Sequence, residues 1–282
     1  MTICVCGAGT MGSGIAQVAA QSGFDTILFD LNKTVLDNAK VSIQKNLDYL
    51  LTKKKIDLEE KKTIYSRIRF VENIKECIGS LIIEAIVEKE DAKVALFTEL
   101  AKFNGPEVVF ATNTSSLSIS SLQEKIPFPE RVVGMHFFNP AYVMKLVEVV
   151  NGAKTSDAAS QIVFDISTKM GKQAVMCKDA PGFIVNRVAR HYYLESLKIV
   201  EEGIASFEEV DTLLESTGFK MGPFKLMDLI GMDINLAVSQ SLYDAYDQAP
   251  RFQPSALQIE KVNNKHLGKK TGKGFYNYQQ KG

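Results

Sequence analysis

Of the three histidines in the 282-residue sequence, His136 stands where it could do acid/base chemistry. It lies near the end of the apolar run VVGMHFF, just before an Asn-Pro turn. Glu148 lies in the next apolar run, LVEVV, where a carboxylate is costly to bury unless it is paired. A His136–Glu148 pair would orient the imidazole and stabilise its protonated form, as a general acid/base requires. The alternative is a structural core histidine beside a glutamate at a strand edge.

Two further groups of polar residues could contact a substrate. An apolar strand over 108–111 is followed directly by Asn113, Thr114, Ser115 and Ser116. A polar cluster at the carboxyl end of a strand is typical of a binding loop, although Ser and Thr also cap helices. Asn186 follows the Pro-Gly pair of DAPGF, where it could place an amide between two domains. Alone, it is no better than a polar residue at a helix start.

Near the N-terminus, GAGTMG forms a G-x-G-x-x-G motif between a strand-like run and a helical one. Its positions are Gly7, Ala8, Gly9, Thr10, Met11 and Gly12. The first glycine suits a tight turn, the second lets the backbone approach a pyrophosphate, and the third lets helix and strand pack closely. The helix N-terminus offers N–H groups and a positive dipole end to phosphates. The alternative is a plain tight turn.

Asp30 ends the second strand-like run, at the distance from the glycines expected for an acid that binds a ribose hydroxyl. Its carboxylate would repel a 2′-phosphate, so we expect NAD(H) in preference to NADP(H). Lys33 lies nearby and could soften that preference. An FAD-binding domain is a further alternative, which a helical second half suits poorly.

These residues need a sheet to position them, and the first two thirds of the chain supply the pattern. Strands are expected in TICVC, DTILFD, LIIEAIV, EVVFAT, RVVGMHFF and KLVEVV, and helices over 11–22, 32–51 and 90–103. Strands alternating with helices indicate βαβ units and a mostly parallel sheet. After DAPGF the pattern turns helical, over 184–203, 208–217 and 233–249. The predicted fold class is α/β, with a Rossmann-like dinucleotide-binding domain over 1–182 and an all-helical substrate and dimerisation domain over 183–282.

Composition narrows the function classes. Lys+Arg and Asp+Glu both number 33, so the net charge is zero and we expect no nucleic acid as a partner. No apolar run reaches the length of a membrane span. The chain starts on a strand-like run without a leader pattern, which favours the cytoplasm. Cys4 and Cys6 are expected to be buried as small hydrophobic residues, and no Cys/His spacing predicts a metal site.

Five segments together resemble the 3-hydroxyacyl-CoA dehydrogenase family, and most closely its short bacterial 3-hydroxybutyryl-CoA dehydrogenases. The segments are GAGTMGSGIA, NTSSLSI, GMHFFNPAYVMKLVEVV, DAPGFIVNR and GKGFYNY, in order along essentially the whole chain. GMHFFNP followed by KLVEV is far more specific than the glycine motif. The resemblance implies reversible reduction of acetoacetyl-CoA to 3-hydroxybutyryl-CoA with NAD(H).

The resemblance also implies roles for individual residues. The catalytic set is His136 as general acid/base, Glu148 as its partner, and Ser115 and Asn186 as hydrogen-bond donors to the substrate. The cofactor set is the glycine motif, Asp30, Glu88, Lys93, Asn113, Ser115 and Asn139. Asn46, Lys53 and Lys54 are the residues implied to bind the CoA tail. The family usually has Ser at the position of Asn46, and runs of lysines are usually just solvated. A homodimer through the helical domain is expected.

Two other functions stay open on the sequence. A dehydrogenase of a free hydroxy acid would use the same cofactor domain. A non-catalytic, crystallin-like NAD-binding protein would reuse the fold. The intact catalytic positions argue against this alternative.

Overall fold

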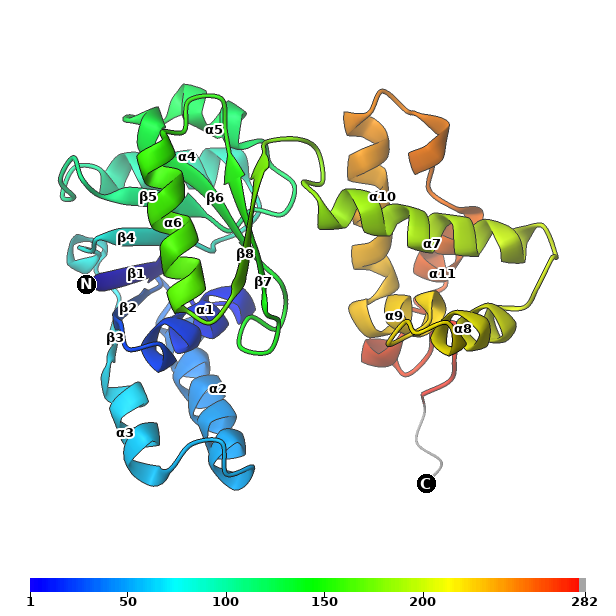
Figure 1. Ribbon diagram of the computed structural model, residues 1–282, viewed down its shortest axis with the longest axis horizontal. Helices are drawn as coiled ribbons and strands as arrows, with labels where there is room; N and C mark the ends of the chain where they lie inside the picture. The colour runs from blue at the N-terminus through cyan, green and yellow to red at the C-terminus, as the bar shows by residue number, and fades with distance from the viewer. Residues whose placement is uncertain (279–282) are drawn as a thin grey trace. The chain divides into compact units, whose positions relative to one another are not determined.

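The computed structural model describes residues 1–278, and the chain divides into two compact units, the first ending at Ala180 and the second starting at Pro181. The first unit is built on one sheet and the second on helices (Figure 1). No helix within residues 1–278 combines the length and the apolar character that crossing a membrane requires.

Within the described residues, eight strands form one sheet in the order β3-β2-β1-β4-β5-β6-β7-β8. The strands are β1 (Thr2–Cys6), β2 (Asp25–Phe29), β3 (Ile68–Val71), β4 (Leu81–Glu84), β5 (Val109–Thr112), β6 (Val132–Phe137), β7 (Leu146–Asn151) and β8 (Gln173–Lys178). Strands β1 to β6 run parallel, whereas β7 is antiparallel to β6 and β8 is parallel to β7. The carboxyl ends of β1, β2, β4, β5 and β6 therefore share one edge of the sheet, where ligands bind in such folds.

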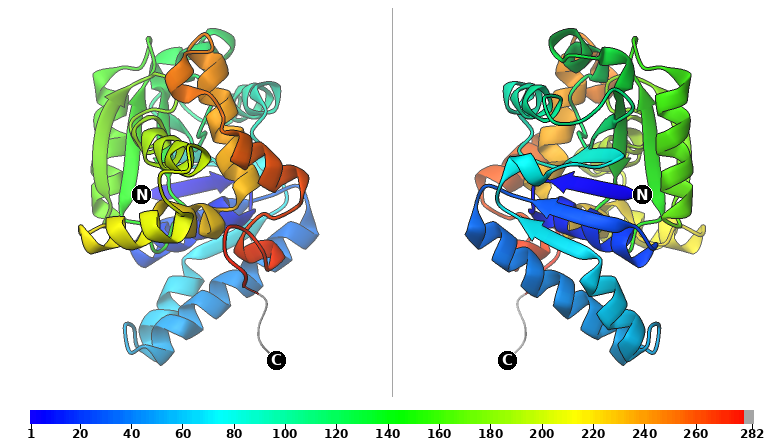
Figure 2. Two further views of the ribbon diagram at one scale, coloured as in Figure 1. Left: turned by 90° about the vertical axis from the view of Figure 1, so that its right-hand side faces the viewer. Right: turned by 90° about the vertical axis from the view of Figure 1, so that its left-hand side faces the viewer.

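Helices cover both faces of this sheet. They are α1 (Thr10–Gln21), α2 (Lys33–Thr52), α3 (Leu58–Ser66), α4 (Glu90–Leu100), α5 (Ile119–Lys125) and α6 (Asp157–Lys169). Alternate residues of a strand point to opposite faces, so Ile3 and Val5 of β1 join the core under α1, α2 and α6. On the other face, Phe97 of α4 packs edge-on against Phe110 of β5, with ring centroids 5.5 Å apart. Helices α2 and α3 lie side by side and extend beyond the sheet (Figures 1 and 2).

The second unit is an all-helical domain with its own core. It contains α7 (Val185–Glu201), α8 (Phe207–Ser216), α9 (Pro223–Ile230), α10 (Met232–Ala245) and α11 (Ala256–Asn263). Leu197, Phe224 and Met227 are among its buried residues. The buried carboxylate of Asp228 accepts hydrogen bonds from the backbone N–H groups of Phe275 and Tyr276, both at 2.9 Å. The aromatic run near the C-terminus is thereby held against α9.

The predicted fold class is confirmed, but two local predictions differ from the structure and several elements were not predicted. The LIIEAIV strand stops at Glu84, and Asp30 follows β2 rather than ending it. β3 and β8 were not predicted: β3 is only four residues long and contains Arg69, and every residue of β8 is half-buried or exposed. α3, α5, α6, α9 and α11 were also not predicted.

Candidate active site

Two positions of the glycine loop between β1 and α1 have no room for a side chain. Gly7 has a φ of +102°, and a Cβ there would lie 2.5 Å from the carbonyl oxygen of Ala85. A Cβ on Gly12 would lie 1.7 Å from the carbonyl oxygen of Gly7, so α1 packs directly on the turn. A Cβ on Gly9 would meet no atom within 4 Å, which leaves that side of the loop open. The two tight glycines shape the loop and the third faces free space.

Asp30 is held beside this loop. One carboxylate oxygen accepts the Ala8 N–H at 2.9 Å, and the other accepts the Asn32 N–H at 2.9 Å. No side chain caps the N-terminus of α1 at Gly9. An uncapped helix start with an open glycine and a fixed carboxylate matches what a dinucleotide needs, namely N–H groups for its phosphates and an acceptor for its ribose. The residues present therefore fit NAD(H).

His136 and Glu148 come together across the antiparallel pair of β6 and β7. They are register partners, and the Nδ1 atom of His136 lies 2.7 Å from Oε2 of Glu148. Both side chains are buried, with Glu148 only 1% exposed. The ring of His136 also packs on that of Phe138, with centroids 4.5 Å apart. With Nδ1 engaged by the carboxylate, Nε2 is the ring nitrogen that can exchange a proton with a ligand.

The loop after β5 is tied to its neighbours at the same edge. Asn113 Oδ1 accepts the backbone N–H of Phe137, the residue after His136, at 2.9 Å. Glu88 Oε1 accepts the Thr114 hydroxyl at 2.6 Å and the backbone N–H of Ser115 at 2.9 Å. The Ser115 hydroxyl is half-buried and lies 3.5 Å from the same oxygen. Glu88, the 113–116 loop and the end of β6 thus form one connected edge.

A buried ion-pair chain lies beneath this loop. Lys93 Nζ donates to Glu84 at 2.6 and 2.8 Å and lies 3.1 Å from Glu88 Oε2. The Thr112 hydroxyl donates to Glu84 at 2.6 Å. Burial raises the pKa of Glu84 despite these partners. Burial also acts to raise the pKa of Glu88, but the charge of Lys93 and the hydrogen bonds from Thr114 and Ser115 outweigh it and lower that pKa.

Sequence reasoning missed Glu84 and Thr112, although each ends a strand at the edge where ligands bind. A carboxylate closing the apolar run LIIE was the available signal. Lys93, predicted to contact the cofactor, is only 1% exposed, and the structure shows it in contact with Glu84 and Glu88. Asn139 is exposed and precedes a cis peptide bond to Pro140.

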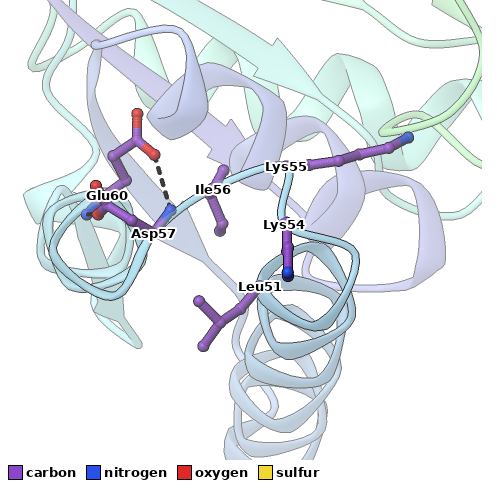
Figure 3. A pocket seen from close by; sticks show the side chains of 6 residues that line it. All are labelled: Leu51, Lys54, Lys55, Ile56, Asp57 and Glu60. Atoms are coloured by element: carbon purple, nitrogen blue, oxygen red, sulfur yellow. Dashed lines mark hydrogen bonds between the residues drawn. The ribbon is translucent and has the colours of Figure 1, made fainter.

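The residues predicted to meet the CoA tail lie on and after α2. The Asn46 amide donates to Gln17 Oε1 at 3.0 Å, while Lys53 and Lys54 are exposed at the helix end. An open pocket of about 390 Å³ lies beside them, and Figure 3 shows its lining. The lining residues are Leu51, Lys54, Lys55, Ile56, Asp57 and Glu60. The Lys55 side chain points away from Asp57 and Glu60, and the Asp57 backbone N–H donates to Glu60 Oε2 at 2.9 Å (Figure 3).

Asn186 belongs to the second unit, in the first turn of α7, where it is half-buried. Its predicted role beside His136 stays a prediction.

A loop that fits a dinucleotide and an imidazole–carboxylate pair at the same sheet edge define the class of nicotinamide-dependent oxidoreductases. Two family models match the chain: "3-hydroxyacyl-CoA dehydrogenase, NAD binding domain" over residues 2–180 and "3-hydroxyacyl-CoA dehydrogenase, C-terminal domain" over residues 182–278. The chain belongs to the 3-hydroxyacyl-CoA dehydrogenase family. The predicted family, enzyme class and NAD(H) cofactor are confirmed.

Individual relatives agree with this assignment. The 3-hydroxyadipyl-CoA dehydrogenase of Escherichia coli K12 is 44% identical over 280 residues, covering 99% of this chain and 59% of the relative's length. A probable 3-hydroxybutyryl-CoA dehydrogenase of Deinococcus radiodurans is 40% identical and covered over 99% of its length by 97% of this chain. The crystal structure of (S)-3-hydroxybutyryl-CoA dehydrogenase from Ralstonia eutropha is 36% identical, with a TM-score of 0.94 over 99% of both chains.

Proposed function

We propose that this protein is an NAD(H)-dependent dehydrogenase of short-chain 3-hydroxyacyl-CoA thioesters, interconverting acetoacetyl-CoA and 3-hydroxybutyryl-CoA. The observation that carries the proposal is the buried His136–Glu148 pair, with its 2.7 Å contact, at the end of β6. Relatives covered over nearly their whole length by this chain are named 3-hydroxybutyryl-CoA dehydrogenases, which supports the short-chain thioester.

The chemistry that NAD(H) supplies when bound is hydride donation in reduction and hydride acceptance in oxidation. Gly7, Gly9 and Gly12 shape the loop for its phosphates, and Asp30 holds its ribose. In reduction, protonated His136 gives the Nε2 proton to the substrate's oxygen at carbon 3. In oxidation, neutral His136 takes that proton back.

Glu148 stabilises the imidazolium and holds Nδ1, so that Nε2 is the atom that exchanges the proton. General acid/base assistance of this kind contributes about 10²–10⁴-fold in rate. Ser115 and Asn186 donate hydrogen bonds to the reacting oxygens, a preorganised electrostatic contribution. Asn46, Lys53 and Lys54 contact the CoA tail, where the two exposed lysines supply positive charge to its phosphates. The protein acts in the cytoplasm as a homodimer joined through the helical domain.

The experiment that tests this function is NADH-linked reduction followed by absorbance, with acetoacetyl-CoA, longer 3-oxoacyl-CoA thioesters and free acetoacetate as parallel substrates. Turnover of acetoacetyl-CoA without turnover of acetoacetate is expected. Reduction of the free acid alone would assign a hydroxy-acid dehydrogenase instead. Absence of turnover with every thioester, while NADH still binds, would leave a non-catalytic NAD-binding protein. Repeating the series with NADPH checks the role of Asp30.

A further inference from the structure

Three of the four cysteines gather on the face of the sheet opposite Ile3 and Val5. Cys4 and Cys6 lie two residues apart on β1 and so point to the same face. Cys77 follows the short helical turn Ile74–Glu76 in the segment that leads to β4. The three sulfur atoms lie within 4.8 Å of one another, and all three residues are fully buried. None of the three forms a disulfide.

The spacing of these sulfur atoms matches that of metal-bound thiolates. Zn–S bonds are about 2.3 Å long, which places the sulfur atoms of a three-thiolate site about 4 Å apart. Cys4 Sγ and Cys6 Sγ are 3.9 Å apart, far beyond the disulfide length of about 2.05 Å. We propose that Cys4, Cys6 and Cys77 form a binding site for a thiophilic divalent cation, of which Zn²⁺ and Cd²⁺ are the representatives.

Binding is proton exchange without a change of oxidation state. Each sulfur forms one metal–sulfur bond, each S–H proton goes to solvent, and a divalent cation with three thiolates leaves a net charge of minus one. A buried charge needs a partner, and Arg69 of β3 is the nearby cation. Its guanidinium donates to the Glu76 carbonyl oxygen at 3.2 Å, one residue before Cys77.

The backbone around Cys77 is anchored, so the site is preorganised rather than assembled by the cation. Asn104 Nδ2 donates to the Cys77 carbonyl oxygen at 2.9 Å, and Asn104 Oδ1 accepts the Gly79 N–H at 3.3 Å. Between these two residues Ile78 is 56% exposed, so the cluster lies one residue below the surface. We expect cation entry to require opening of this segment and to be slow.

Occupancy would connect the site to cofactor binding. Cys6 directly precedes Gly7, the turn glycine of the dinucleotide loop. A cation would tie the end of β1 to the segment before β4. Ala85, the residue that follows β4, contacts the Gly7 turn. The cation would therefore stabilise the first domain and change the affinity for NADH, although no cysteine touches the glycine loop's open side.

The test is titration of the reduced full-length protein with Cd²⁺, followed by the ultraviolet sulfur-to-cadmium charge-transfer band, which counts thiolates. One Cd²⁺ per chain with a three-thiolate intensity is expected. Cys77→Ser should lose a third of that intensity and bind more than about tenfold more weakly, because even changes behind the ligands of a metal site cost 10–100-fold. Cys177→Ser is the matched control, since this half-buried cysteine lies outside the cluster, and its titration should equal the wild type.

Thermal unfolding keeps the test independent of variant stability. Cd²⁺, and Zn²⁺ in a parallel arm, should raise the Tm of the wild type and of Cys177→Ser by more than that of Cys6→Ala or Cys77→Ser at the same cation concentration. NADH binding by each variant shows that it is folded. A charge-transfer band that keeps its full intensity in Cys77→Ser, or one that vanishes in Cys177→Ser, would overturn the proposal, as would absence of any band after prolonged incubation. A response to Cd²⁺ alone would assign the site to the softer cation.

Discussion

Replacing Lys93 with methionine removes the cation that, among residues 1–278, pairs with the buried Glu84 carboxylate. The side chains of Lys93 and Glu84 are 1% and 0% exposed, and they meet at 2.6 Å. Removing one partner of a buried ion pair costs about 3–5 kcal/mol, because an uncompensated charge stays in the core. Methionine keeps the length and the apolar stem of the side chain, so most of this loss is electrostatic. A fall in Tm of about 6–20 °C follows for a domain of this size.

Urea and thermal unfolding of Lys93→Met and of a matched surface control measure this loss. The control is Lys102→Met, which breaks the Lys102–Glu99 pair, whose side chains are 61% and 41% exposed. An exposed pair of this kind contributes less than about 1 kcal/mol. The double variant Lys93→Met/Glu84→Gln should recover much of the loss, since it removes the stranded charge as well. Equal losses in Lys93→Met and Lys102→Met would refute the reasoning.

The stability lost in Lys93→Met should change with pH in a defined direction. Burial already raises the pKa of Glu84, and without Lys93 that pKa rises further. A group whose pKa is raised in the folded state contributes stability that is present below its unfolded pKa, about 4.3, and is lost as pH rises through the folded value. The stability difference between wild type and Lys93→Met should therefore widen as pH rises from the unfolded pKa, about 4.3, into the neutral range. A difference that shrinks over this window would contradict the assignment of Glu84 as the stranded charge.

Three other variants test the site directly. His136→Gln should lower kcat by about 10²–10⁴-fold while leaving NADH affinity near that of the wild type, measured by fluorescence titration; unchanged turnover would remove His136 from the mechanism. Gly12→Ala should abolish NADH binding or folding, because its Cβ would lie 1.7 Å from the Gly7 carbonyl oxygen. Gly9→Ala, with no atom within 4 Å, should keep the fold and weaken only NADH binding.

The alternation of strands and helices predicts the fold class. Strands of a parallel sheet are buried on both faces, so they stand out in the sequence as continuous apolar runs. The cost of burying a carboxylate among valines made the His136–Glu148 contact one of two interpretations, the other being a structural core histidine, and the family resemblance favoured the pair. β8 left no such signal, and Glu84 closes the apolar run LIIE without any sign of the residue that pairs with it. β8 is partly exposed at the sheet edge, and a lysine on α4 looks like any exposed helix residue until the fold buries it. Contacts that depend on tertiary burial cannot be seen in a residue's neighbours along the chain.

The same burial explains how the 113–116 loop is held. The backbone N–H groups of Ser115 and Ser116 donate to Glu88 Oε1, at 2.9 and 3.2 Å, rather than to a strand. Glu88 is itself held through Lys93 to Glu84, which the Thr112 hydroxyl joins to the end of β5. The chain of charged groups that begins at Glu84 of β4 therefore positions the 113–116 loop, which is not part of a strand. For that reason Lys93→Met should disturb the Ser115 loop as well as lower the stability. Lys102→Met, at an exposed position just after α4, should do neither.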